Sequence, residues 1–291
     1  MTILDTFKKF SAILKNRGID YAENETRLLI CHLLGISSPH FYAHTDRVLT
    51  GDELAQLENM VKRRLNGEPV AYITGHCEFY GIDLYVDRRV LIPRPETEIL
   101  VEGALSVGRK IKKSMVIVDV GTGSGAIAIA IAMNLPKAFI YAVDVSSDAL
   151  EVAWNNVCRY GLQERVNLIR GNLMDSLTVA ADIVVANLPY ISEKEMNKLP
   201  VEICRNEPEI ALKGGVTGTE LIEKLIKQLP DHLKNGGVAL LEIGYGHDKA
   251  ILKIIKGTFP SAQVYYCKDF SGIKRAVKIT FSSFDNDIQL M

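Results

Sequence analysis

The chain has 291 residues, 47% apolar and 24% charged, which is the composition of a folded globular protein and excludes a disordered, collagen-like or coiled-coil chain. At about 150 residues per domain, this length suggests two domains. Lys and Arg total 34, Asp and Glu total 35, and the net charge is -1. Because nucleic-acid-binding proteins usually carry a basic excess, we expect no direct nucleic-acid partner, although the net charge leaves a local basic patch open.

Five cysteines are scattered singly without a Cys-x-x-Cys pair, and the histidines form no ligand-spaced cluster with them. This pattern favours reduced thiols over a disulfide framework or a metal site. No apolar run reaches the ~18 residues of a membrane helix, and the first residues lack the apolar region of a secretory signal. We therefore expect a cytoplasmic protein that binds no metal and no membrane. We also expect a monomer, although nothing in the sequence determines the oligomeric state.

The first part of the chain shows helical periodicity. Helices are predicted near residues 3–14, over 26–34, and over 54–65, where apolar residues recur three and four positions apart. Glycines after the second and third stretches are helix-stop signals. These patterns predict a small helical bundle over 1–71. Residues 72–110 then read as a short hairpin followed by a proline-fixed linker.

Beyond residue 111 the pattern changes to alternating strands and helices. Strands are predicted at 116–120, 139–143, 166–169, 183–186 and 238–243, and helices through Met133 and over 147–160, 221–229 and 249–255. Segments 264–266 and 276–280 are predicted to pair as a closing antiparallel hairpin. This order indicates an α/β fold with a doubly wound, mostly parallel sheet, whose ligands bind beyond the carboxyl ends of the strands.

A glycine-rich loop, Asp-Val-Gly-Thr-Gly-Ser-Gly at 119–125, directly follows the first of these strands. Glycines allow a tight turn and a close approach of backbone to ligand, although such a loop can also be only a turn. Asp144 ends the next strand, close to the ~20-residue separation expected of a ribose-binding acid. Its alternative role is to cap the following helix. No Gly-Lys-Ser/Thr follows the glycines, which excludes a P-loop.

The tetrapeptide Asn187-Leu188-Pro189-Tyr190 follows the fourth strand, where the active site of such a fold belongs. It could be only a polar turn ended by proline. Chemically it suits methylation of an amide or amino nitrogen. The Asn187 side-chain oxygen and the Leu188 carbonyl could each accept one N–H of the target, and Tyr190 could pack on its planar group. Positioning alone can supply ~7–11 kcal/mol of a barrier, so no strong base is needed.

Together, the glycine loop, Asp144 and the Asn-x-Pro-Tyr motif resemble those of class I S-adenosylmethionine-dependent methyltransferases. Further segments resemble the HemK/PrmC family, the bacterial release factor glutamine N5-methyltransferases. They are Tyr72–Gly75, Phe79–Gly81, Leu91–Glu98 and Leu241–Gly244. The resemblance covers essentially the whole chain, and Leu91–Glu98 is its most specific part. No role for Arg94, Glu96 or Glu242 follows from the sequence.

The resemblance implies that 111–291 is a catalytic domain that binds S-adenosylmethionine. The substrate implied is the glutamine of the Gly-Gly-Gln motif of class 1 peptide chain release factors, gripped partly by the N-terminal bundle. Substrate-binding and catalytic roles fall on Asn187, Leu188, Pro189 and Tyr190. The cofactor-binding residues implied are Asp119, Gly121, Thr122, Gly123, Ser124, Gly125, Asp144, Val145, Asn172, Leu173 and Asn187, with the glycines near the methionine part and Asn172 and Leu173 near adenine.

Two positions depart from the family pattern. Leu188 stands where the family usually has proline, which keeps the backbone carbonyl but loses rigidity. Asn172 stands where aspartate is more common, which removes charge assistance to the adenine amine.

Two alternative functions remain. The tetrapeptide also resembles that of rRNA adenine N6-methyltransferases, which are expected to be basic and to carry their extra domain after the core. The chain could also be a non-catalytic binding module, although the intact glycines, Asp144 and Asn187 speak against that.

Overall fold

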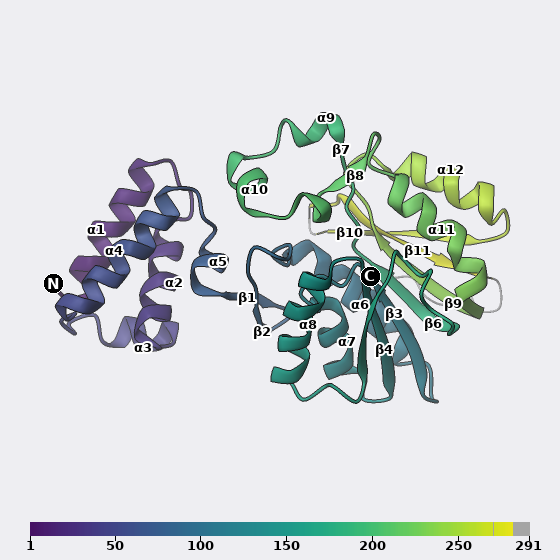
Figure 1. The fold of residues 1–291 in the computed structure, drawn as a ribbon, viewed down its shortest axis with the longest axis horizontal. Coiled ribbons are helices and arrows are strands. Elements are labelled where there is room, and N and C mark those ends of the chain that lie inside the picture. The colour runs from purple at the N-terminus through teal and green to yellow at the C-terminus, as the bar shows by residue number, and fades with distance from the viewer. Residues whose placement is uncertain (270, 282–291) are drawn as a thin grey trace. The chain divides into compact units, whose positions relative to one another are not determined.

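The structure, a computed structural model, describes residues 1–269 and 271–281, so residues 282–291 of the expected domain 111–291 lie outside it (Figure 1). It divides into two compact units. The N-terminal unit comprises residues 1–76 together with 200–206. The sheet unit comprises residues 77–199 and the described residues from 207 onward. None of the described helices is both long and apolar enough to cross a membrane.

The N-terminal unit is helical, as the sequence predicts. Thr2 and Thr50 begin two of its helices with capping boxes. In each, the threonine hydroxyl accepts from the backbone N–H three residues on, and the carboxylate of that residue accepts from the threonine backbone N–H. Leu29 and Leu57 are fully buried in its core. Its helices are α1 (Ile3–Asn16), α2 (Ala22–Leu34), α3 (Ser38–Ala43), α4 (Gly51–Leu65), α5 (Val70–Thr74) and α10 (Val201–Asn206).

Helix α10 joins this unit although it lies more than a hundred positions later in the chain. The Arg64 guanidinium, whose side chain is 7% exposed, binds Glu25 at 2.7 Å and Glu202 of α10 at 3.0 Å. The Asn206 side chain donates to the Gly67 carbonyl at 2.8 Å. The segment 200–206 is therefore held by a largely buried ion-pair cluster and a cap on the end of α4.

The sheet unit is built on a seven-stranded sheet in the order β10-β11-β9-β6-β3-β4-β5. Pairs among β5, β4, β3, β6 and β9 are parallel, and β11 pairs antiparallel with both β9 and β10. This confirms the predicted mostly parallel sheet with an antiparallel C-terminal pair. The strands are β3 (Met115–Val120), β4 (Ala138–Asp144), β5 (Val166–Arg170), β6 (Ala181–Ala186), β9 (Leu233–Glu242), β10 (Gln263–Lys268) and β11 (Lys274–Thr280).

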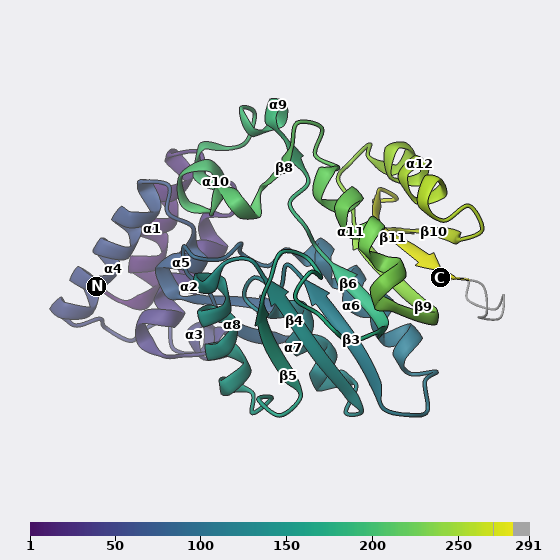
Figure 2. The same ribbon diagram turned by 45° about the vertical axis from the view of Figure 1, so that its right-hand side comes forward.

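Helices cover both faces of this sheet because both faces are apolar (Figure 2). Alternate strand residues enter opposite cores: Ile117 packs with α6 and α7, and Val118 packs with α11 and α12. The longer helices are α6 (Glu98–Gly108), α7 (Ala126–Asn134), α8 (Ser147–Arg159), α11 (Glu220–His232) and α12 (Asp248–Thr258). The short elements are β1 (His76–Phe79), β2 (Ile82–Tyr85), η1 (Pro95–Thr97), β7 (Ile191–Ser192), α9 (Glu193–Met196), η2 (Glu209–Ala211) and β8 (Lys213–Gly215).

The strand order reverses at β3, because the chain moves from β3 through β4 to β5 and then returns to β6 on the other side of β3. In such sheets, ligands bind at this switch point, beyond the strand carboxyl ends. Val120 of β3 pairs with Val143 of β4 and Ala186 of β6, and Ala186 pairs with Leu241 of β9. The next residue of each strand or loop therefore reaches the same edge of the sheet.

Candidate active site

The glycine-rich loop leaves β3 in a conformation that only glycine adopts freely. Gly121, Gly123 and Gly125 have φ values of 76°, 55° and 82°. The N–H groups of Gly121 and Thr122 both donate to the Val143 carbonyl, at 2.8 and 3.0 Å. The loop is thus fixed against the end of β4, and it carries backbone rather than side chain toward the switch point.

Asp144 stands at the end of β4, beside this loop. Its Oδ2 accepts from the Gly123 N–H at 2.9 Å, and its Oδ1 accepts from the Ser146 N–H at 3.0 Å. Burial raises the pKa of the Asp144 carboxyl, and these backbone N–H groups counteract the rise. The carboxylate still has acceptor capacity for a hydroxyl donor such as that of a ribose.

The segment after β5 forms another wall of the site. The Gly171 N–H donates to the Asp144 carbonyl at 3.0 Å. Leu173 has a φ of 54°, a left-handed conformation that is uncommon for a leucine and marks a functional position more often than chance. Asn172 is exposed and Leu173 is buried, so the pair presents a polar and an apolar side chain to the same space.

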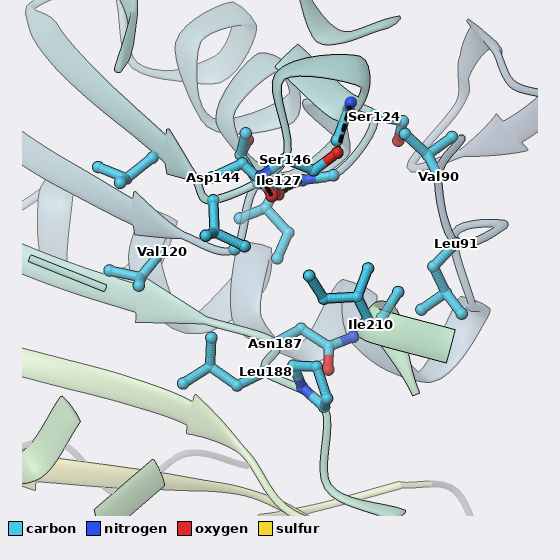
Figure 3. A pocket seen from close by; sticks show the side chains of 18 of the residues that line it. Val90, Leu91, Val120, Ser124, Ile127, Asp144, Ser146, Asn187, Leu188 and Ile210 are labelled. Carbon is cyan, nitrogen blue, oxygen red and sulfur yellow. Dashed lines mark hydrogen bonds between the residues drawn. The ribbon is translucent and has the colours of Figure 1, made fainter. Parts of the chain in front are cut away.

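These segments enclose a cavity of about 340 Å³, the size of an ordinary small-molecule site. Figure 3 shows Asp144, Ser146 and Ile127 on one side of it and Asn187 and Leu188 on the other. Of the residues that the sequence singles out, Gly121, Thr122, Gly123, Ser124, Asp144, Val145, Asn172, Leu173, Asn187, Leu188 and Pro189 line this cavity. Asp119, Gly125 and Tyr190 do not line it.

Among the residues that the structure describes, the Asn187 side chain has one hydrogen-bond partner. Its Nδ2 donates to the Thr97 hydroxyl at 2.9 Å. That hydroxyl in turn donates to Glu242 Oε2 at 2.7 Å. The Tyr190 hydroxyl donates to the other Glu242 oxygen at 3.4 Å. The tetrapeptide is thus connected to β9 and to the segment before α6 by one chain of hydrogen bonds.

Two carboxyl groups that do not line the cavity, those of Asp119 and Glu242, are buried. Burial raises the pKa of Glu242 to about 7, and hydrogen bonds from Thr97 and Tyr190 oppose the rise. Burial likewise raises the pKa of Asp119 to about 7, although the Thr122 hydroxyl donates to it at 2.7 Å. Tyr190 lies in the same apolar surroundings near Glu242, which raises its pKa to about 12. Titratable groups whose pKa values are shifted this far are common at functional sites.

The sequence reasoning did not assign several residues that the fold brings here. Val90, Leu91 and Thr97 line the cavity from the segment expected to be a linker, and Ile210 lines it from η2. Glu242, whose role was open, is 3% exposed and follows the strand residue paired with Ala186. The motif containing Thr97 was the available signal, but motif membership alone does not give a side chain's partner. Among the described residues, no cluster suited to holding a metal ion occurs.

The fold and the site together define a class I methyltransferase: a sheet of this order, a glycine loop after β3, an acid at the end of β4 and an Asn-x-Pro-Tyr motif after β6. Solved structures that share the fold include the following two. A catalytic domain of hMettl16 bound to an RNA hairpin is 16% identical, with a TM-score of 0.58 over 90% of this chain and 93% of that one. A methyltransferase from Pyrococcus furiosus is 18% identical, with a TM-score of 0.50 over 77% and 98%.

The chain belongs to the release factor glutamine methyltransferase family. The protein of that name from Chlorobaculum tepidum is 35% identical to it, over 95% of this chain and 96% of the relative. The one from Koribacter versatilis is 38% identical over 88% and 91%. A ribosomal protein uL3 glutamine methyltransferase from Bordetella pertussis is 39% identical over 84% and 82%. The model of the PrmC N-terminal domain matches residues 5–75, and that of the ribosomal protein L11 methyltransferase matches residues 103–195.

Proposed function

We propose that this chain transfers a methyl group from S-adenosylmethionine to the side-chain amide nitrogen of the glutamine in the Gly-Gly-Gln motif of class 1 peptide chain release factors. One observation carries the proposal: Asn187 and Asp144 line the same cavity, and the Asn187 amide nitrogen is already bound to Thr97. The Asn187 oxygen is then the atom left to accept from an amide. The names of the relatives favour glutamine over an adenine base.

The residues at the switch point fit this cofactor. A Cβ built on Gly121 would stand 3.0 Å from the Leu188 side chain, so a larger residue there would have to push that side chain aside. Asp144 offers two carboxylate oxygens to the ribose hydroxyls, and Asn172 with Leu173 would bind the adenine. When bound, the cofactor supplies an electrophilic methyl group on a positively charged sulfur. The protein's part is to hold that carbon in line with the target nitrogen.

The substrate amide is a poor nucleophile because its lone pair is delocalised, so orientation matters most. The Asn187 Oδ1 and the Leu188 carbonyl would each accept one N–H of the target, which fixes its plane relative to the methyl group. The bound cofactor would supply the methyl group for the new C–N bond, and its sulfur would keep the electron pair of the C–S bond that breaks. One N–H proton of the substrate is then released, and no strong base on the protein is required.

A second candidate substrate is a glutamine of ribosomal protein uL3, because a relative named for that activity is as similar as those named for release factors. The discriminating experiment incubates the protein with labelled S-adenosylmethionine and either a release factor or uL3. We expect label on the release factor and a methyl group located by mass spectrometry on the Gly-Gly-Gln glutamine. Label on uL3 alone would replace the release factor as substrate, and label on neither would overturn the proposed reaction.

The same proposal extends to the rest of the chain. The N-terminal unit, which matches the PrmC N-terminal domain, would help to grip the release factor. We propose that the protein works as a monomer in the cytoplasm, where release factors act, without a nucleic-acid partner. Sedimentation of the protein with and without a release factor would test this: a concentration-dependent dimer in the free protein would contradict it.

A further inference from the structure

The hydrogen bonds that link Glu242, Thr97 and Asn187 have a fixed donor and acceptor at each step. An ionised carboxylate can only accept hydrogen bonds, so the Thr97 hydroxyl must use its single hydrogen to donate to Glu242. That hydroxyl can then only accept at its remaining lone pairs. The neighbouring Asn187 group must therefore be its NH2 and not its oxygen, as the 2.9 Å contact from Nδ2 shows. The charge on Glu242 thus selects one of the two orientations of the Asn187 side-chain amide, to which it is connected by two hydrogen bonds.

The selected orientation is the one that a substrate amide needs. Within the described part of the chain, nothing donates to the Asn187 oxygen, while Asn187 itself lines the cavity. If the side chain were turned over, its NH2 would take the place of that unpaired oxygen, and it would meet an N–H of a substrate amide donor to donor. That amide hydrogen would then be left unpaired in the site, which weakens binding of the substrate amide.

We propose that Glu242, acting through Thr97, is a positioning residue that holds Asn187 with its oxygen toward the methyl-accepting amide, and that it does so only while its carboxyl group is ionised. This inference rests on the proposed function, since it assumes an amide substrate at Asn187. Protonated Glu242 can donate to Thr97, which frees the Thr97 hydroxyl to donate to the Asn187 oxygen. The network then holds the unproductive orientation equally well.

The groups around Glu242 set where this change falls. Glu96 of η1 raises the pKa of Glu242, and Arg275 of β11 lowers it. Arg275 also forms an ion pair with Asp269 at 2.8 Å, which weakens its effect on the pKa of Glu242. The Tyr190 hydroxyl donates to Glu242 from the segment after β6. Burial outweighs these contacts, so the pKa of Glu242 lies near 7, within the range in which an enzyme is assayed.

The activity test compares Glu242→Gln, Thr97→Val and Thr97→Ser with the wild type between about pH 5.5 and 9. We expect the wild-type kcat to rise with pH through an inflection near 7. Glu242→Gln and Thr97→Val should lose about 10- to 100-fold in kcat at the plateau and lose this inflection, with the KM for the cofactor within about threefold. Thr97→Ser keeps a hydroxyl and should keep both rate and inflection. Glu223→Gln, an exposed acid on α11, is the matched control.

A second measurement does not depend on turnover. In protein labelled with 13C in glutamate carboxyl groups and 15N in asparagine side chains, the Asn187 NH2 signals should follow the Glu242 titration. In Thr97→Val they should become independent of it, and the pKa of Glu242 should rise because a donor has been lost. This readout holds even if the substrate is another amide, so failure of the proposed function and failure of this inference are distinguishable.

Three results would overturn the inference. They are a wild-type rate and pH profile in Glu242→Gln, full activity in Thr97→Val, or Asn187 signals that ignore the Glu242 titration in the wild type. If Glu242→Gln fails to fold, Thr97→Val and Thr97→Ser decide, since they differ at the hydroxyl that the inference requires. A merely structural network would lower stability in these variants and would leave the pH inflection in place.

Discussion

The side chain of Asn156 binds the backbone of Tyr85 on both sides. Its Oδ1 accepts from the Tyr85 N–H at 2.8 Å, and its Nδ2 donates to the Tyr85 carbonyl at 2.9 Å. The same Nδ2 donates to the Ser124 carbonyl at 2.9 Å. One buried amide on α8 therefore replaces a strand partner for β2 and at the same time holds the glycine-rich loop.

We expect Asn156→Ala to destabilise the protein by about 2–4 kcal/mol, because it leaves the half-buried N–H and carbonyl of Tyr85 and the buried carbonyl of Ser124 without this partner. Urea unfolding would measure this. Asn155→Ala is the matched control, since Asn155 is the exposed neighbour on the same helix. Cofactor affinity should fall with the loosened loop; equal effects of the two substitutions would show that the buried amide has no such role.

The role proposed for Asn187 separates binding from turnover. We expect Asn187→Ala to lower kcat about 10²- to 10³-fold, as loss of one preorganised partner of the reacting group does elsewhere. The cofactor dissociation constant, measured by calorimetry, should stay within about threefold. Asn197→Ala, at the exposed end of α9, serves as control. Lost cofactor binding in Asn187→Ala would mean that the residue acts on the cofactor and not on the amide.

Gly121 and Gly161 allow the effect of crowding at the cavity to be isolated. Both have positive φ, 76° and 64°, so alanine strains either backbone by a similar amount. A Cβ at Gly121 would meet Leu188 at 3.0 Å, whereas nothing lies within 4 Å of one at Gly161. Both variants should lose stability, but only Gly121→Ala should lose cofactor affinity in calorimetry. Equal affinities would place the cofactor away from this loop.

The two buried acids predict a dependence of stability on pH. Burial raises the pKa of Asp119 and Glu242 to about 7 in the folded protein, from ordinary values of 3.8 and 4.5. The folded state then keeps protons that the unfolded chain has released. This contribution to stability is complete below the unfolded values and is lost as pH rises through about 7.

Urea unfolding at several pH values would test that dependence. We expect the free energy of unfolding to fall from about pH 5 to about pH 8, and Asp119→Asn to flatten part of the slope. Asp148→Asn, at the first turn of α8, should leave the slope unchanged because the side chain is exposed. A wild-type stability that rises over this range would contradict the raised pKa values.

Local patterns were enough to predict most of the sheet unit. The sequence Ala-Ile-Ala-Ile-Ala-Ile-Ala in α7 alternates as a strand would, yet its place after a glycine loop predicts a helix, and all seven of these residues are buried. Alternation fails as a signal there because every face of the helix is covered. By contrast, β9 begins at Leu233, before the expected start at 238, because the Asn-Gly-Gly sequence within it reads as a turn.

The features that could not be predicted depend on contacts between residues far apart in the chain. Nothing near Glu242 in the chain reveals that Thr97 binds it, because 145 positions separate them. The glycine loop and Asp144 could be predicted since their roles follow from place on a strand. Helix α10 was not predicted at all, because its six residues show no periodicity and are held by Arg64 of a distant helix.

The polypeptide passes from one unit to the other three times, after residues 76, 199 and 206. A truncation that removes residues 1–76 would therefore strip α10 of its anchor and leave Glu202 without its guanidinium. The complementary fragment would lack one of its own helices. Neither half can be separated by a single cut, so any attempt to express the methyl-transferring part alone must also redesign the excursion at 200–206.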